Sequence, residues 1–248
     1  MNKYQGGKRF MKVIIIPDSH LKPWIFDKAN ELLENGLAEK AVCLMDIADD
    51  WGEEANLDLY EKTYNRAITF AKEHPETLWC YGNHDLSYIW DELESGYSYM
   101  ASWTVKKKIK ELKEALADPS RLAYIHRIDN VLFSHGGLAY EFVRNYIPGR
   151  FHDDIDHVIW TINNFGRMEM WQDLSPIWYR PQEYKGKMFK ATEYLQVVGH
   201  TPVEEIQKDR NVISCDVFST YRDGTPIGAP QFLVIDTETG EYAIIPVE

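Results

Sequence analysis

Polar side chains that can bind metal ions or transfer protons stand directly behind short apolar runs at five places in the 248-residue sequence. They offer carboxylate, imidazole and amide groups but no thiolate. Their position is informative, because ligands of open α/β sheets bind beyond the carboxyl ends of the strands. The five segments are Asp18-Ser19-His20, Asp46-Ile47-Ala48-Asp49, Gly82-Asn83-His84-Asp85, Ser134-His135-Gly136-Gly137 and Gly199-His200-Thr201-Pro202.

Six of these side chains together favour a pair of divalent ions. Oxygen and nitrogen ligands without thiolate suit Mn, Fe, Zn, Co or Ni. Two ions about 3.5–4 Å apart need a shared ligand, and an aspartate can give one oxygen to each. Two such ions, two carboxylates and one hydroxide leave a charge of about +1, which attracts phosphate. The six are Asp18, His20, Asp46, Asn83, His135 and His200.

Alternating strand and helix patterns place three of the segments on one sheet. Apolar runs at 13–16, 41–45 and 77–81 predict buried strands, and helical spacing predicts helices at 27–38 and 57–74. A strand–helix–strand order predicts right-handed crossovers and parallel strands. The polar segments behind these strands should therefore meet at one edge of the sheet.

A lysine-rich helix at about 103–117 separates this half from a second set of strands. The expected fold class is therefore α/β, with two mixed sheets and helices outside them. Apolar runs predict the later strands at 122–128, 131–134, 194–198, 211–215, 231–235 and 242–246, the last two as an antiparallel pair.

One domain is expected to span residues 1–248. Residues 138–193 are rich in aromatic side chains, and we interpret them as a helical insertion beside the site. Residues 1–10 are polar and basic, which predicts a flexible tail and leaves Met1 and Met11 as alternative functional starts.

Charge excludes several classes of partner. The chain has 27 Lys and Arg against 39 Asp and Glu, for a formal net charge of −12, which repels nucleic acid and anionic membranes. No apolar run approaches the roughly 20 residues that span a bilayer. Cys43, Cys80 and Cys215 read as core thiols in a reducing compartment. We therefore expect a cytoplasmic protein without nucleic-acid or membrane partners, and its oligomeric state stays open.

The order of the motifs resembles that of the calcineurin-like metallophosphoesterases. Asp-x-His, Asp-x-x-Asp, Gly-Asn-His-Asp, His-Gly and Gly-His follow one another between residue 13 and about residue 202. The resemblance implies a four-layer α/β/β/α sandwich and a phosphatase in which metal-activated hydroxide attacks a phosphate ester. It also implies two divalent ions, with Mn favoured over Fe, Zn, Ni or Co.

The family pattern implies which side chain would hold which ion. Asp46 would bridge the two ions with its carboxylate. The first ion would also be held by Asp18 and His20, and the second by Asn83, His135 and His200.

The same family pattern also implies which residues act in catalysis and in phosphate binding. His84 would be the general acid that protonates the leaving oxygen, and Asp49 would orient it. Asn83 would also contact the substrate phosphate. Trp178-Tyr179-Arg180 resembles the Trp-x-Arg of phage-type enzymes, so Arg180 would bind phosphate through its guanidinium fork.

Within the family, the chain most resembles the phosphoprotein phosphatase branch, which includes bacterial and phage serine/threonine phosphatases and diadenosine tetraphosphatases. Thr201-Pro202 follows His200 where other branches place a further histidine. The chain departs from this branch at Met45, which replaces a glycine, and at Asp50, which replaces a phosphate-binding arginine.

Several substrate classes follow from this pattern. A serine/threonine phosphoprotein is expected, and a small phosphate ester, a dinucleoside polyphosphate or a phosphodiester are the alternatives. A non-enzymatic metal-binding scaffold of the same fold is a further alternative. The presence of His84 and of all six predicted ligands argues against it.

Overall fold

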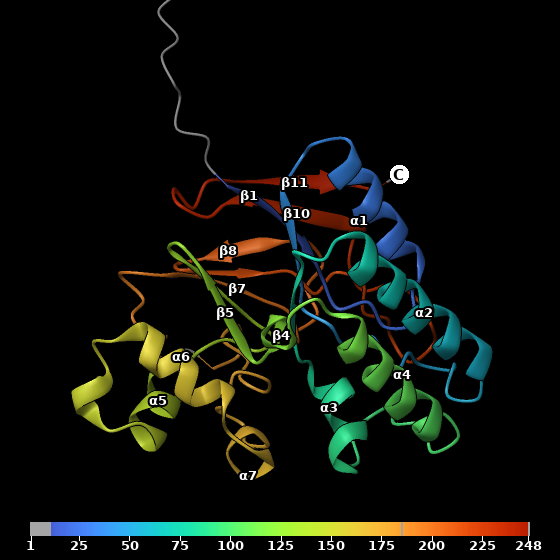
Figure 1. The fold of residues 1–248 in the computed structure, drawn as a ribbon, viewed down its shortest axis with the longest axis horizontal. Coiled ribbons are helices and arrows are strands. Elements are labelled where there is room, and N and C mark those ends of the chain that lie inside the picture. The colour runs from blue at the N-terminus through green and yellow to red at the C-terminus, as the bar shows by residue number, and fades with distance from the viewer. Residues whose placement is uncertain (1–10, 185, 248) are drawn as a thin grey trace, which may run out of the picture.

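Two mixed sheets flanked by helices make up the fold in a computed structural model that describes residues 11–184 and 186–247 (Figure 1). This arrangement confirms the predicted α/β class. The predicted tail at 1–10 lies outside the described residues.

Sheet 1 has six strands in the order β11-β10-β1-β2-β3-β4. Strands β1 to β4 run parallel, whereas β10 pairs antiparallel with both β1 and β11. The parallel crossovers and the antiparallel C-terminal pair were both predicted. The strands are β1 Lys12–Ile16, β2 Lys40–Cys43, β3 Leu78–Cys80, β4 Leu122–Ala123, β10 Gln231–Asp236 and β11 Tyr242–Pro246.

Sheet 2 has five strands in the order β5-β6-β7-β9-β8. Strands β6, β7 and β9 are parallel, and β5 and β8 are antiparallel to their neighbours. Strand β8 was not predicted, because its three residues are polar and exposed. The strands are β5 Ile125–Ile128, β6 Val131–Ser134, β7 Leu195–Val198, β8 Gln207–Asp209 and β9 Val212–Ser214.

The single strand predicted at 122–128 is wrong, because the chain changes sheets within it. Strand β4 pairs with β3 in sheet 1, and β5 pairs with β6 in sheet 2. The Asn163 side chain holds the change of direction: its Oδ1 accepts from the backbone N–H of Tyr124 and of Ile125, and its Nδ2 donates to the Ile125 carbonyl. A distant amide thus replaces the ladder bonds that are lost between the two strands.

Helices flank the sheets in two groups (Figure 1). α1 contacts β1 and β2 of sheet 1 and α6 contacts β5 of sheet 2, while α2 packs on α4. Among the described residues, no helix is both long and apolar enough to cross a membrane. The helices are α1 Trp24–Glu34, α2 Leu57–Glu73, α3 Asn83–Trp90, α4 Ser102–Ala115, α5 Tyr140–Tyr146, α6 Ile155–Asn163 and α7 Arg167–Met170, with short 3-10 turns at Pro119–Arg121 and Gly149–Phe151.

Two helices differ from their predictions. α1 ends at Glu34 rather than at residue 38, because Gly36 takes the left-handed conformation with φ +75° and stops the helix. α3 was not predicted as a helix, because its first residues were interpreted only as a polar segment after a strand. The predicted helical insertion has helices only as far as Met170, and the described residues of 171–184 and 186–194 form no helix or strand.

Sheet 2 separates the buried apolar side chains into two clusters, one on each of its faces. On β6, Val131 and Phe133 belong to the buried cluster shared with sheet 1, whereas Leu132 belongs to the cluster shared with α5 and α6. This alternation follows from the two-residue period of a strand. Both faces of β6 are therefore covered, which fixes the register of the strand that leads to His135.

His126 joins the two sheets through a buried hydrogen bond. It lies on β5, and its Nε2 is 3.0 Å from the carbonyl oxygen of Trp79 on β3. Burial lowers the pKa of His126 to about 4. The folded protein therefore keeps this ring neutral at a pH where the unfolded chain protonates it.

We predict that His126 makes folding sensitive to mild acid. Its contribution to the free energy of unfolding is complete above the unfolded pKa of about 6.5 and is lost as the pH falls toward the folded pKa, by about 3 kcal/mol in total. Urea unfolding at pH 7, 6 and 5 should show a shallower loss of stability for His126→Gln than for the natural protein. Parallel pH dependence in the two proteins would contradict this account.

Candidate metal and catalytic site

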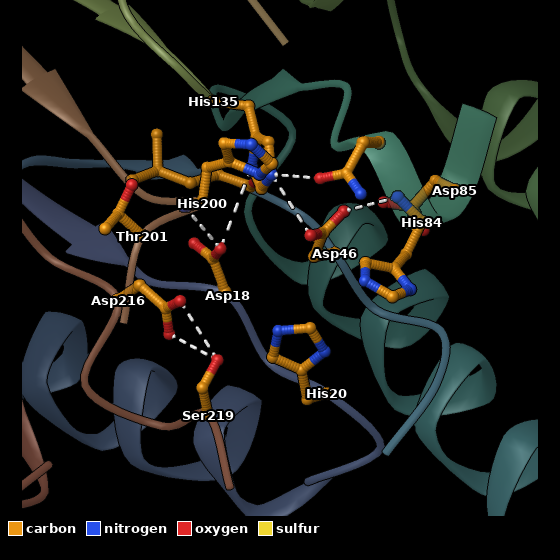
Figure 2. A network of polar contacts seen from close by, with 12 residues as sticks. Asp18, His20, Asp46, His84, Asp85, His135, His200, Thr201, Asp216 and Ser219 are labelled. Atoms are coloured by element: carbon orange, nitrogen blue, oxygen red, sulfur yellow. Dashed lines mark hydrogen bonds and ion pairs between the residues drawn. The ribbon is translucent and has the colours of Figure 1, made fainter. Parts of the chain in front are cut away.

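The polar segments behind β1, β2, β3, β6 and β7 meet beside one open cavity. These strands belong to both sheets, and Figure 2 shows side chains of the segments behind them turned toward one another. The five polar segments therefore meet at one place, as the strand order predicted. Histidine and carboxylate side chains face one another there at short range.

Two groups of ligand atoms could each hold an ion. One comprises Asp18, His20 and Asp46, and the other comprises Asp46, His135 and His200, with the ligand atoms of each group within 4.8 Å of one another. Asp46 belongs to both groups. A shared carboxylate is what two neighbouring ions require, so the geometry suits a pair of ions.

Asn83, the sixth predicted ligand, lies with the second group. Its Oδ1 is 3.0 Å from Nε2 of His135, and the same Nε2 is 3.0 Å from Oδ2 of Asp46. Asn83 is also the first residue of α3, where the chain turns after β3. All six side chains predicted as ligands are therefore brought together.

Backbone carbonyls orient two of the imidazole rings. Nδ1 of His20 lies 2.9 Å from the Asp49 carbonyl oxygen, and Nδ1 of His135 lies 3.0 Å from that of Leu44. A ring that donates through Nδ1 keeps Nε2 for an ion, and such outer hydrogen bonds are typical of metal-binding histidines.

Two buried atoms in this cluster have no hydrogen-bond partner among the described residues. They are Oδ1 of Asp18 and Nε2 of His200. Burial, together with the charges of Asp216 and Asp46, raises the pKa of Asp18. Burial and the charge of His135 lower the pKa of His200, which leaves its ring neutral. Divalent cations held by the two ligand groups would satisfy these two atoms, one in each group, and would offset the crowded carboxylates, so the residues fit metal ions.

Asp46 and His135 stabilise each other's charged forms. Burial alone would lower the pKa of His135, but the carboxylates of Asp46 and Asp18 outweigh it and raise this pKa to about 9. Burial likewise opposes ionisation of Asp46, but His135 and His84 hold its pKa well below the ordinary value. An ion that binds His135 must therefore displace a proton, which makes metal affinity depend on pH.

Several site residues have a left-handed backbone, which is unusual outside glycine. The φ angles are +36° at His20, +39° at Asp46, +64° at Asp49 and +64° at His200. Each costs on the order of 1 kcal/mol or more, and such residues gather at functional sites. The sharp turns aim each side chain back toward the cluster.

Glycines provide the space behind two carboxylates. A Cβ on Gly82 would lie 1.9 Å from Oδ1 of Asp46, and a Cβ on Gly199 would lie 1.9 Å from Oδ1 of Asp18. No side chain can be accommodated at either position without moving its carboxylate. Steric exclusion of any side chain therefore explains why the Gly-Asn-His and Gly-His motifs begin with glycine.

His84 and Asp49 form the predicted pair at the edge of this cluster. Nδ1 of His84 lies 2.9 Å from Oδ2 of Asp49. Burial lowers the pKa of His84, but the charge of Asp46 and the hydrogen bond to Asp49 outweigh it and raise this pKa to about 10. The ring lines the cavity, and the contact to Asp49 uses Nδ1, which leaves Nε2 for a substrate.

Arg180, predicted to bind phosphate, lines the same cavity as the ligand groups. Its Nη1 donates to the His200 carbonyl at 2.8 Å and to Oγ1 of Thr201 at 3.3 Å, and the side chain lines the cavity. The segment before it packs on Gly136, where an added Cβ would lie 2.7 Å from the Tyr179 carbonyl. Gly136 thus allows the approach that brings Arg180 to the site.

The profile of the calcineurin-like phosphoesterase family matches residues 11–222, which includes every residue of the cluster. The chain is a member of the calcineurin-like phosphoesterase family. It is therefore a phosphoric ester hydrolase, of a family that uses divalent metal ions. None of the curated proteins compared with it matches.

Solved structures resemble this phosphoesterase over nearly its whole length. The protein-tyrosine phosphatase of a psychrophilic Shewanella is 16% identical, with 96% of this chain and 81% of that chain covered and a TM-score of 0.58. An archaeal phosphodiesterase (16%, 96% and 100%, TM-score 0.42) and a metallophosphoesterase of Sphaerobacter thermophilus (16%, 97% and 89%, TM-score 0.45) are also similar. The first likeness shows the fold alone.

Asp216 is a site residue that the sequence analysis missed. It is 1% exposed, lines the cavity and lies beside Asp18 and His20 (Figure 2). Both of its oxygens accept from Oγ of Ser219, at 2.8 and 2.9 Å. Asp216 follows β9 as the other polar segments follow their strands, so the same position rule could have found it.

Asp50, at the position of the missing arginine, is neutralised within the phosphoesterase. Nζ of Lys22 lies 2.6 Å from its Oδ2, and the Thr220 hydroxyl donates to its Oδ1. Asp50 lines the cavity, and Lys22, which is outside the lining, offsets its charge. No role was predicted for Asp50, and the contact shows that it is held by neighbours rather than by solvent.

Two tyrosine hydroxyls donate hydrogen bonds to Asp49. We predict that they keep His84 in position through this carboxylate. Oδ1 of Asp49 accepts from the hydroxyl of Tyr60 at 2.7 Å and from that of Tyr88. Tyr88→Phe removes one donor from a buried carboxylate, and kcat should fall about tenfold with KM unchanged. Steady-state kinetics on an alkyl phosphate, with metal content measured in parallel, would check this. Equal kcat in both proteins would contradict it.

Proposed function

We propose that this phosphoesterase holds two divalent ions, with Mn favoured, and hydrolyses phosphomonoesters, with a serine/threonine phosphoprotein as its substrate. The observation that supports this best is the sharing of Asp46 between two ligand groups in one cavity with His84. Asp18 and His20 would complete the first ion's ligands. The ligands of the second ion would be completed by Asn83, His135 and His200.

The chain's own residues would bind the substrate and move the proton. When bound, the ions supply an activated hydroxide and positive charge against the phosphate. Arg180 and Asn83 would donate to phosphate oxygens. His84 would protonate the leaving oxygen from Nε2, because Asp49 holds the ring through Nδ1.

The cavity lining favours a single phosphate over a polyphosphate. Among the described residues, Arg180 is the only Lys or Arg that lines the cavity. A dinucleoside polyphosphate carries several further negative charges, and each needs a cation. Trp178 of the predicted insertion is packed by its neighbours rather than open for stacking: its ring lies edge-on to Trp171 and to His200.

Metal analysis combined with a substrate panel tests this proposal. The purified chain should hold two ions and should hydrolyse p-nitrophenyl phosphate faster than bis(p-nitrophenyl) phosphate or diadenosine tetraphosphate, with Mn, Fe(II), Zn, Ni and Co compared in turn. Phosphoserine, phosphothreonine and phosphotyrosine peptides belong on the panel, because the Shewanella structure is that of a protein-tyrosine phosphatase. Fewer than one ion per chain, with no hydrolysis, would overturn it.

A further inference from the structure

Glu94 is a cavity carboxylate beside the proposed acid His84, and no Lys or Arg of the described residues is paired with it. It lines the cavity and is half-buried, and its Oε1 accepts a hydrogen bond from Oγ of the adjacent Ser95 at 3.1 Å. Asp50 on the same lining has Lys22 at 2.6 Å. Apart from its electrostatic effect on His84, the charge of Glu94 faces the cavity, where a substrate can meet it.

The loop that carries Glu94 lies against the proposed acid. A methyl group on Gly96 would lie 3.6 Å from Cβ of Asp49 and 3.9 Å from Cε1 of His84. Farther along, the Ser98 N–H donates to the hydroxyl of Tyr88 at 2.8 Å, and that hydroxyl donates to Asp49. The loop is thus tied to the same hydrogen-bond network that orients His84.

This position decides which part of a substrate meets Glu94. His84 gives its proton to the leaving oxygen, so the alcohol half of the ester must lie on the His84 side of the phosphate. Glu94 stands two residues before Gly96, where an added methyl would reach His84, and its charge acts on the His84 ring, so it lies on the His84 side. A positive charge on the alcohol half would find a carboxylate there, and a negative charge would be repelled.

We propose that Glu94 selects phosphate esters whose alcohol half carries a cationic group close to the ester oxygen. This rests on the proposed phosphomonoesterase function. The cationic group has two sources: the ammonium of a small amino alcohol, or a Lys or Arg side chain beside a phosphorylated residue in a polypeptide. Both present a positive charge to the same carboxylate.

Matched probes separate charge from size and small esters from peptides. O-phosphoethanolamine is compared with propyl phosphate, and a phosphoserine peptide with Lys after the phosphoserine is compared with the same peptide carrying Glu. The natural protein should prefer the cationic member of at least one pair by about five- to tenfold in kcat/KM, through KM. Preference in the first pair alone identifies a small amino alcohol, and preference in the second pair identifies a basic polypeptide.

Variants assign the preference to Glu94. Glu94→Gln should abolish the preference and Glu94→Lys should reverse it, each measured as the ratio of kcat/KM between the two members of a probe pair. Asp91→Asn removes one charge from the same loop outside the cavity lining, at a left-handed residue that Asn tolerates, and should keep the preference.

The outcomes distinguish this inference from the proposed function. Hydrolysis of all probes without a cationic preference, or a preference that Glu94→Gln retains, overturns the role of Glu94 and leaves the phosphomonoesterase proposal standing. Absence of hydrolysis of every probe with every metal overturns both.

Discussion

His84→Asn should lower kcat for a phosphate monoester by about 10²–10⁴-fold while both ions stay bound. The asparagine amide can still reach Asp49 in place of Nδ1, which lies 2.9 Å from that carboxylate in the natural protein. It has no group at the position of Nε2, so the leaving oxygen loses its proton donor. Steady-state kinetics and metal analysis of the same preparation measure the two effects separately.

The leaving group provides an internal control for this prediction. An alkyl alcohol depends on protonation far more than p-nitrophenol does, so the loss should be larger on an alkyl phosphate. Equal losses on both esters would show that His84 acts by another route. An unchanged rate with full metal content would remove His84 from the mechanism.

Gly199→Ala should lower metal affinity by about 10–100-fold and reduce activity at limiting metal accordingly. The new Cβ would lie 1.9 Å from Oδ1 and 2.8 Å from Cγ of Asp18. Asp18 is fully buried and its Oδ2 accepts from the His200 N–H at 2.7 Å, so it cannot turn away without losing that bond. Overpacking of this kind also costs about 1–3 kcal/mol of stability.

Gly149→Ala is the matched control for Gly199→Ala. An added Cβ at Gly149 meets nothing within 4 Å, so metal binding, activity and thermal stability should match those of the natural protein. Isothermal titration with Mn would compare the three proteins. If Gly199→Ala binds Mn as tightly as Gly149→Ala does, Asp18 is not held against Gly199 in the way described.

The sequence predicted the ligand cluster because its physical basis is simple. Asp18, Asp46 and Asn83 follow parallel strands of one sheet, and His135 and His200 follow parallel strands of the other. The carboxyl ends of such strands meet at one edge whatever the details of the helices. Only the packing of one sheet against the other had to be inferred from the resemblance to a family.

The groups around this cluster could not be predicted in the same way. Tyr60 occupies an apolar position of the predicted 57–74 helix, and Tyr88 lies in a segment for which no helix was predicted. Nothing in the sequence shows that both hydroxyls donate to Asp49. The change of sheets at Tyr124 depends on Asn163, a residue about forty positions away. Such features arise from tertiary contacts that local pattern does not encode.

Met45 shows how the structure explains a departure that the sequence could only record. The branch that the chain resembles has glycine there, and Met45 has φ +56°. A left-handed backbone favours glycine, so methionine is strained at this position. Its side chain is fully buried, and the packing it gains offsets part of that strain.

The left-handed backbone at His20, Asp46, Asp49 and His200 has a consequence for protein engineering. Glycine at any of them would relax the backbone, and the same exchange would remove a side chain to which the proposed mechanism assigns a role. Selection for heat resistance alone should therefore accumulate changes at these positions and produce inactive proteins. A directed-evolution campaign on this enzyme has to screen turnover in every round.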